Sequence, residues 1–250
     1  MASGSVTYVG HATTLIEVDG TRLLTDPVLR GRIGHIRRIA PAPAPGLSVD
    51  GILVSHAHHD HLDLPSLRGL PPGVAVLAPP GVARLIARRT AHRATAVKAG
   101  DRVTVGGVEV VVTEAVHDDR RMPLGRGLGA VGYLVTGSAR VYFAGDTDVF
   151  DGMRDLSPAL DVALLPIWGW GPRVGTGHMD PERAALAAAL LAPRMAVPIH
   201  WGTLAGPRVW WRDDPAMPAR EFERLVAIHA PHTTVRVLAP GAAMAVPAAA

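Results

Sequence analysis

Short apolar runs separated by turn residues recur along the chain and predict a domain rich in β-strands. The first runs cover residues 6–9, 13–18 and 21–25, and Asp19-Gly20 between the last two is a strong signal for a two-residue hairpin. Further strands are predicted over residues 52–54, 74–77, 103–105, 108–116, 132–135, 141–143, 162–165, 195–199 and 235–238.

Three helices are predicted between these strands, over residues 80–89, 181–191 and 216–228. Asp180 is the expected N-cap of the second, with Pro181 in its first turn. Strands and helices therefore come in two successive runs, which predicts two packed β-sheets with helices outside, an α/β sandwich. We expect residues 1–250 to form a single domain.

Two segments lack any such pattern. Residues 30–50, which include the Pro-Ala repeat of residues 40–46, are predicted to form an irregular loop of the kind that can act as a mobile lid. The tail from residue 242 to 250 is low in complexity, and we expect it to be disordered.

Composition narrows the function classes. The chain has 250 residues and no cysteine, so any metal must be held by histidine and carboxylate groups. The net charge of +3 comes with scattered arginines and a single lysine, Lys98, so we expect no nucleic-acid partner. The start of the chain lacks the features of a signal peptide, and the longest apolar stretch, residues 184–192, is too short to span a bilayer. These features predict a cytoplasmic protein without a transmembrane segment.

A dense group of metal-ligand residue types follows the apolar run 52–54. Residues 55–63 read Ser-His-Ala-His-His-Asp-His-Leu-Asp, and an H-x-H-x-D-H pattern within them contains His56, His58, Asp60 and His61. Imidazole and carboxylate groups together suit zinc and similar divalent ions. A strand that ends in a tight loop can point such groups into one pocket, so the pattern indicates the start of two adjacent metal sites rather than a histidine-rich surface loop.

Other residues of the same types occur where predicted strands end. They are His11, Asp26, His117, Asp146 and His200. Two zinc ions about 3.5–4 Å apart need roughly three protein ligands each and a shared bridge. We therefore assign His56, His58 and His117 to one ion, and Asp60, His61 and His200 to the other. Asp146 follows Gly145, which permits a close backbone approach, and is predicted to bridge both ions.

This set of residues resembles the metallo-β-lactamase-fold hydrolase superfamily. Three flanking segments, Gly10-His-Ala-Thr13, Leu24-Thr-Asp-Pro27 and Gly177-His-Met-Asp-Pro-Glu182, are similar to the branch that contains N-acyl-phosphatidylethanolamine phospholipase D and ascorbate-6-phosphate lactonase. The resemblance implies a four-layer αββα sandwich with a dinuclear site at one edge. The loops at residues 30–45 and 168–178 are the chain's own, so the identity of the substrate does not transfer.

The resemblance and the ligand set predict a metal-dependent hydrolase that uses a metal-bridging hydroxide. Zinc is the favoured ion, and manganese or iron would accept the same ligands. Asp60 is expected to orient the hydroxide in addition to ligating, and His178, placed near the metals by the resemblance, to donate to an oxyanion or leaving group. The alternative for His178 is an ordinary loop histidine.

The predicted substrate is a small molecule, anionic or lipid-like, with a phosphodiester or phospholipid slightly favoured over a lactone or other carboxylic ester. The oligomeric state is not predicted. A nuclease would need an RNA-gripping arm or an inserted domain, and the sequence has neither. A non-catalytic binding module of this fold would usually have lost ligands, whereas this chain has all of them.

Secondary roles are predicted for residues around this set. His11 and Asp26 are expected to orient ligands through hydrogen bonds, although Asp26 could equally cap the turn before Pro27. All five tryptophans lie between residues 168 and 211, where they would form either an aromatic wall beside the metals or part of the core. Arg120 and Arg121 could hold a phosphate or carboxylate, with simple solvent exposure as the alternative.

Overall fold

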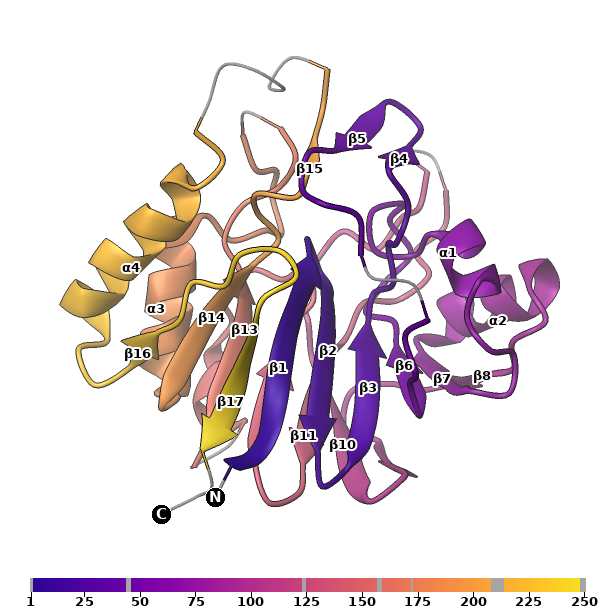
Figure 1. The fold of residues 1–250 in the computed structure, drawn as a ribbon, viewed down its shortest axis with the longest axis horizontal. Helices are drawn as coiled ribbons and strands as arrows, with labels where there is room; N and C mark the ends of the chain where they lie inside the picture. Colours follow the sequence, from indigo (N-terminus) through magenta and orange to yellow (C-terminus); the bar gives the residue numbers. More distant parts are fainter. Residues whose placement is uncertain are drawn as a thin grey trace.

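Two β-sheets form the centre of the molecule and face each other, as the sequence predicts. The computed structural model describes residues 2–43, 46–122, 125–156, 159–171, 173–207 and 214–247. Within these residues each large sheet has seven strands, in the orders β17-β1-β2-β3-β6-β7-β8 and β16-β14-β13-β12-β11-β10-β9. Helices cover the outer faces (Figure 1), so the αββα sandwich is confirmed.

The first sheet combines an antiparallel and a parallel half. Its strands are β1 (Ala2–Gly10), β2 (Thr13–Val18), β3 (Thr21–Thr25), β6 (Gly51–Leu53), β7 (Ala75–Ala78), β8 (Ala94–Ala96) and β17 (Ala243–Pro247). Strands β1, β2 and β3 are antiparallel, and β3, β6, β7 and β8 run parallel. Asp19 and Gly20 join β2 to β3 with φ of 50° and 75°, which is the left-handed conformation that such a hairpin requires.

The second sheet has the same mixed character. Its strands are β9 (Arg102–Val105), β10 (Val108–Thr113), β11 (Gly132–Thr136), β12 (Arg140–Phe143), β13 (Val162–Pro166), β14 (Met195–Ile199) and β16 (Thr234–Val235). β9 to β12 are antiparallel neighbours, and β12, β13, β14 and β16 run parallel. The predicted strands at 108–116 and 235–238 are therefore too long, because the chain leaves the sheet at Thr113 and Val235.

Helices pack on the outside of each sheet. α1 (Leu64–Arg68) and α2 (Pro80–Arg89) lie beside the first sheet, and α3 (Pro181–Leu191) and α4 (Met217–His229) beside the second. A 3₁₀-helix, η1 (Asp151–Asp155), precedes β13. Asp180 caps α3 as predicted, because its carboxylate accepts the Arg183 amide at 2.9 Å. None of the helices in the described part of the chain has the length and apolar character needed to cross a membrane.

Two hydrophobic layers hold these elements together. Successive side chains of a strand point to opposite faces. Leu23, Leu53 and Leu77 therefore belong to the larger core, which includes residues of both sheets and of the helices on the second sheet. Their neighbours Leu24, Ile52 and Val76 face outward and pack with α1 and α2 in a separate core. Both faces of β6 and β7 are therefore buried, which explains why the sequences of these two strands are continuous apolar runs.

The prediction of an irregular loop over residues 30–50 is wrong for its first part. β4 (Arg32–Ile33) and β5 (Ile36–Arg38) form a hairpin, and β5 also pairs with β15 (Leu204–Ala205) in a small third sheet at the top of Figure 1. Ile33, Ile36, Val28 and Leu204 form a small buried core of their own. The strand that completes this sheet lies far away in sequence, so local patterning could not reveal it.

The expected disorder of residues 242–250 is also wrong where the structure describes them. Residues Ala243–Pro247 form β17, which pairs antiparallel with β1 and lies beside it in Figure 1. Val246 is fully buried. An alanine-rich segment has little intrinsic order, but the unpaired edge of β1 supplies the hydrogen bonds that fix it. Residues 248–250 lie outside the described part.

The directions of the strands bring the chemically active loops to one edge. β1, β3 and β6 run the same way and end just before His11, Asp26 and His56. In the second sheet β10, β12 and β14 also share one direction, and they lead to His117, Asp146 and His200. The two edges touch at Gly145, where φ is 61° and an added Cβ would lie 2.6 Å from Cβ of Ser55.

We predict that Gly145→Ala destabilises the protein by about 2–4 kcal/mol, from left-handed strain together with overpacking against Ser55. The free energy of unfolding would be measured by denaturant titration with a chelator present, so that metal binding does not contribute. Gly20→Ala is the matched control, because Gly20 has a φ of 75° but no atom within 4 Å of the added Cβ. It should cost only about 1 kcal/mol, and equal losses in the two variants would contradict the close approach of the sheet edges.

Candidate metal centre

Two groups of potential metal ligands lie side by side where the sheet edges meet. In each group, one ligand atom from every member lies within 4.8 Å of the others. One group is His56, His58 and His117, and the other is Asp60, His61 and His200 together with His11. The structure thus brings together the members of each predicted triad, from the loop after β6 and from the ends of β10 and β14, and places His11 beside the second triad.

The first group consists of three rings that are anchored from outside. The Oγ of Ser55 lies 2.9 Å from Nδ1 of His56, the carbonyl of Arg120 lies 3.1 Å from Nε2 of His58, and the carbonyl of Gly177 lies 2.7 Å from Nδ1 of His117. The other ring nitrogens face inward, with Nε2 of His117 3.1 Å from Nδ1 of His58. The inward Nε2 of His56 is buried and has no hydrogen-bond partner among the described residues.

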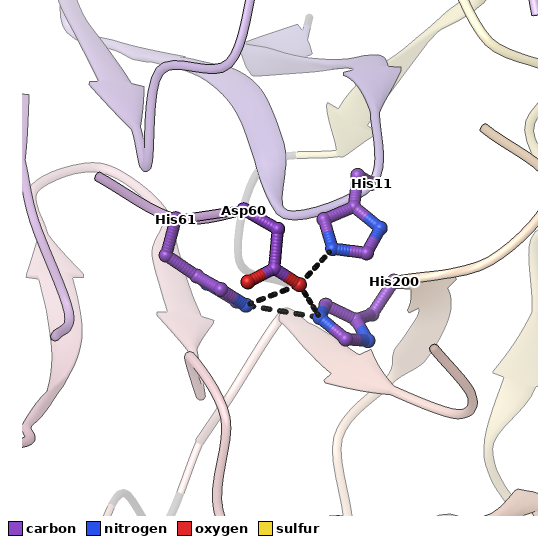
Figure 2. Close-up of side chains that lie close together, drawn as sticks. All are labelled: His11, Asp60, His61 and His200. Atoms are coloured by element: carbon purple, nitrogen blue, oxygen red, sulfur yellow. Dashed lines mark hydrogen bonds and ion pairs between the residues drawn. The ribbon is translucent and has the colours of Figure 1, made fainter. Parts of the chain in front are cut away.

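The second group is anchored in the same way. Nδ1 of His61 lies 2.8 Å from a carboxylate oxygen of Asp26, and Nδ1 of His200 lies 2.6 Å from the carbonyl of Trp168. Their inward Nε2 atoms are 2.9 Å apart (Figure 2). Asp60 lies beside them with its Oδ2 about equally far from both, 3.9 Å from Nε2 of His61 and 3.8 Å from Nε2 of His200.

Asp60 is itself held by two other side chains. Nε2 of His11 and Nε1 of Trp170 each lie 3.0 Å from its Oδ2, the former drawn in Figure 2. His11 thus has the orienting position that the sequence predicts. Asp26 has it as well, since it accepts hydrogen bonds from the Ser55 amide and hydroxyl in addition to its contact with His61. Asp26 therefore links the two groups through Ser55 and His61.

Asp146 lies between the two groups. Its Oδ2 is 3.1 Å from Nε2 of His61 and 3.3 Å from Nε2 of His178, while Oδ1 is 3.4 Å from Nε2 of His200. Asp146 also clusters with His117 and His178. Oδ1 is buried and has no hydrogen-bond partner in the described part of the chain. Asp146 therefore offers an unpartnered buried oxygen beside members of both groups.

Burial and mutual charge set the protonation states of these groups. Burial alone would raise the pKa of Asp146, but His200 and His61 hold that pKa well below its usual range. Burial opposes protonation of His61, yet Asp146 and Asp26 raise its pKa well above the ordinary value. For His56, burial and the neighbouring His61 push the pKa well below the ordinary value. Without a bound metal, these directions favour a negative charge on Asp146, a balancing positive charge on His61 and a neutral ring for His56, and the unpartnered atoms of Asp146 and His56 fit a divalent cation.

The backbone at this edge is strained where it carries functional side chains. His11, Asp26 and His200 have φ of 58°, 33° and 65°, a region that residues other than glycine rarely adopt. The strain is held in place by a bond between the sheets, in which the amide of His200 donates to the carbonyl of His11 at 2.7 Å. The two strand ends are thereby locked in the geometry that aims both rings inward.

The tryptophans divide into different roles. Trp168 and Trp170 contact the centre through a carbonyl and an indole N–H, respectively. Trp201 is instead a core residue, because it is 6% exposed and stacks on Tyr8 with ring centroids 6.0 Å apart. Trp210 and Trp211 lie outside the described residues. The predicted aromatic wall therefore holds for Trp170 and not for Trp201.

The two arginines after His117 are both committed to protein partners. Arg120 is exposed and pairs with Asp118 at 2.8 Å. Arg121 binds the carbonyls of Ala57 and Leu62, and its other amino group lies 3.1 Å from Nδ1 of His59. Arg121 thus fixes the loop that carries His58, Asp60 and His61. Sequence reasoning missed this contact, and those of Ser55 and Trp170, because each joins segments that are distant or that carry no ligand pattern.

A cavity of about 500 Å³ opens over this arrangement. His58, Asp60, His178 and His200 form its floor, and the β4–β5 hairpin and the segment around Trp170 form its walls. His178 is half-buried, with its Nδ1 3.2 Å from the carbonyl of Thr176 and its Nε2 toward Asp146. The geometry provides a ligand set for cations at the base of a cavity that a small molecule can enter.

Known proteins are similar to this chain in sequence. Residues 21–201 match the family described as Beta-lactamase superfamily domain. A UPF0173 metal-dependent hydrolase of Aeropyrum pernix is 35% identical over 254 residues, covering 94% of this chain and 95% of that protein. A second UPF0173 metal-dependent hydrolase, from Pyrococcus furiosus, is 35% identical over 243 residues, covering 94% and 96%.

Solved structures give the same result. Igni18, described as a novel metallo hydrolase from Ignicoccus hospitalis, is 26% identical with a TM-score of 0.71, covering 96% of this chain and 97% of that chain. CmlA, a diiron β-hydroxylase from Streptomyces venezuelae, has a TM-score of 0.74 at 19% identity, covering 98% of this chain and 54% of that chain, a likeness of fold alone. The finer resemblance to the phospholipase D and lactonase branch stays a prediction. The chain belongs to the β-lactamase superfamily domain family, as a metal-dependent hydrolase of the metallo-β-lactamase fold.

Proposed function

We propose that the site holds two divalent ions, zinc before manganese or iron, and hydrolyses an ester bond of a small molecule. The supporting observation is the set of five imidazole rings, each fixed through one nitrogen while the other faces inward. Neutral histidines with an anchored second nitrogen are typical of metal ligands. Tetrahedral zinc with Zn–N bonds of about 2.0–2.1 Å would place ligand nitrogens roughly 3.3 Å apart, close to the 2.9 and 3.1 Å separations seen here.

The ligands divide by position. His56, His58 and His117 would hold one ion, Asp60, His61 and His200 would hold the other, and Asp146 would bridge them. Two ions so held would supply a hydroxide nucleophile at neutral pH and polarise the bond under attack. The chain has no cysteine to act as a nucleophile. With hydroxide as the nucleophile, the side chains near the ions that are not ligands would position the substrate or transfer protons.

Two of these side chains are assigned such roles. Asp60, fixed by His11 and Trp170, would orient the nucleophile from its position at the cavity floor. His178 would hold a proton at Nε2, where Asp146 raises the His178 pKa against the effect of burial, and donate it to the leaving oxygen. Phosphodiesters and carboxylic esters, including lactones, would both serve as substrates for this arrangement.

The bridging role of Asp146 predicts that Asp146→Ala loses metal and turnover together. The wild type should bind two zinc ions per chain, and the variant should bind zinc more than about 100-fold more weakly, beyond the usual loss from an outer-shell change. Metal content would be measured by mass spectrometry, and turnover on bis(p-nitrophenyl) phosphate and p-nitrophenyl esters. Asp148→Asn, two residues away, is the control. Retention of two ions by Asp146→Ala would refute the assignment.

The contact between Asp26 and His61 predicts a smaller effect. Asp26→Asn should weaken zinc binding by about 10- to 100-fold, because the His61 ring loses the carboxylate that orients it. Competition with a fluorescent zinc chelator would measure the affinity. Asp50→Asn, which changes an exposed carboxylate that accepts the Arg22 amide, should leave the affinity unchanged. An unaltered affinity in Asp26→Asn would show that the contact does not orient the ligand.

The role of His178 predicts a separation of binding from chemistry. His178→Gln should keep both ions and lower kcat by about 10²- to 10⁴-fold, the usual range for losing a general acid. The loss should be smaller for p-nitrophenyl esters than for alkyl esters, because p-nitrophenolate leaves without a proton. Loss of an ion from His178→Gln would instead identify His178 as a ligand, and an unchanged kcat on alkyl esters would exclude the acid role.

A further inference from the structure

We propose, on the basis of the function above, that the substrate is an uncharged carboxylic ester or lactone whose apolar substituent lies against Trp170. Trp170 would be the residue that determines specificity. The proposal selects one of the two substrate classes that the metal centre could serve. It depends on three features of the cavity: the apolar side chains that line it, the contacts that hold Trp170 in place, and the protein groups that already bind the nearby arginines.

The lining of the cavity is mostly apolar away from the metal centre. Gly169, Trp170, Gly171 and Val174 form one wall, and the β4–β5 hairpin at residues 33–36 forms the other. Trp170 is only partly buried, and its covered side packs on the small core of Val28, Ile33, Ile36 and Leu204. An apolar group in this cavity would therefore leave water for a preformed indole surface.

Trp170 is held rigidly beside the reacting position. Its Nε1 donates to Oδ2 of Asp60 at 3.0 Å, and its backbone carbonyl accepts the Gly206 amide at 2.8 Å. The ring of His35 meets it edge to face, with centroids 5.7 Å apart. Gly206 leaves room for the ring, because an added Cβ there would lie 3.3 Å from Cε3 of Trp170. A substrate group that lies against the indole would thus be next to Asp60.

The charges around the cavity disfavour a substrate that carries a phosphate. Of the described residues that line the cavity, Arg121 and Arg173 are the arginines. Both amino groups of Arg121 bind the ligand loop, as described above, and Arg173 lies at the exposed rim. Arg120 is paired with Asp118. A phosphodiester over the metal centre would therefore find neither Arg120 nor Arg121 free for the bidentate guanidinium contact that phosphate recognition usually employs. The exposed Arg173 alone of these three arginines would be left for it, whereas a neutral ester needs no such contact.

The reaction on such a substrate balances with the residues present. Water loses one proton to solvent, and its oxygen forms a bond to the acyl carbon. The bond between that carbon and the alkoxy oxygen then breaks, and the proton on Nε2 of His178 passes to the leaving alkoxide. His178 regains a proton from solvent, which received the proton that water lost. An acyclic ester yields a carboxylic acid and an alcohol, a lactone yields one hydroxy acid, and the acid product ionises.

The test is a substrate series on the zinc-loaded enzyme. p-Nitrophenyl acetate, butyrate and octanoate, γ-butyrolactone and γ-nonalactone, and bis(p-nitrophenyl) phosphate would be compared by kcat/KM after subtraction of uncatalysed rates. We expect kcat/KM to rise with alkyl length by up to about fourfold for each methylene that is buried, and to be lowest for the phosphodiester. Trp170→Ala should flatten this dependence.

A second readout does not require turnover. A lactam with the alkyl chain of γ-nonalactone would be titrated calorimetrically into the metal-free and zinc-loaded protein. Binding should show a negative heat-capacity change, the signature of apolar burial, and should weaken at least about tenfold in Trp170→Ala.

Trp170→Phe retains a ring but loses the N–H, so it should keep the chain-length dependence of kcat/KM and lower kcat, because Asp60 loses a hydrogen bond. Val174→Trp, which fills the cavity, should reject the longer chains and provides a test if Trp170→Ala does not fold.

The outcomes separate this proposal from the function on which it rests. Preference for the phosphodiester, or a chain-length dependence unaltered in both Trp170→Ala and Val174→Trp, would overturn the assignment of substrate class and leave the hydrolase intact. A protein that binds two zinc ions but turns over no member of the series would overturn both.

Discussion

The structure depends on one constraint: ring nitrogens and carboxylate oxygens that water would normally solvate are collected in a largely buried site. Burying a polar atom without a partner is costly, and here Nε2 of His56 and Oδ1 of Asp146 have no partner among the described residues. Other inward atoms contact one another, as Nε2 of His61 does with Nε2 of His200, and Nε2 of His117 with Nδ1 of His58. The outward ring nitrogens of His56, His58, His61, His117 and His200 are each held by a neighbouring group. A divalent cation bound between the two groups would satisfy the two unpartnered atoms.

The fold meets this constraint by strand direction rather than by a single motif. Ends of like-directed strands in both sheets meet at one edge, and short contacts between sheets hold them there: the His200 amide on the His11 carbonyl, and Gly145 against Ser55. The left-handed φ of His11 and His200 contributes to the same arrangement, because it turns the backbone sharply where β1 and β14 end. Strain at these positions is offset by the large core between the sheets.

The sequence was sufficient to predict the two sheets, the larger helices and the separation of the ligands into two groups. These follow from apolar periodicity and from the placement of histidine and aspartate after apolar runs, which are local signals. It was insufficient for β4, β5, β15 and β17, whose pairing partners are distant or whose own propensity is weak. It also left open whether Trp201 lines the site or belongs to the core, and the structure shows that Trp201 packs on Tyr8. For Arg121 it left open an anion ligand or a solvent-exposed side chain, and neither describes the tertiary contact of Arg121 with the Ala57 and Leu62 carbonyls.

Trp170 connects the metal centre to the choice of substrate. One end of its indole fixes a carboxylate of the centre, and the ring itself faces the cavity. A smaller residue at position 170 would enlarge the cavity and remove the Trp170 donor to Asp60, so that His11 would be left of these two donors. The electrostatics of the centre would therefore change together with the shape of the cavity. Trp170 also packs on the small core beneath the third sheet, so a change at position 170 would affect the packing of that sheet as well as the centre. Specificity in this chain is therefore expected to vary more easily at Val174 and the β4–β5 hairpin, which line the cavity without contacting a carboxylate of the centre.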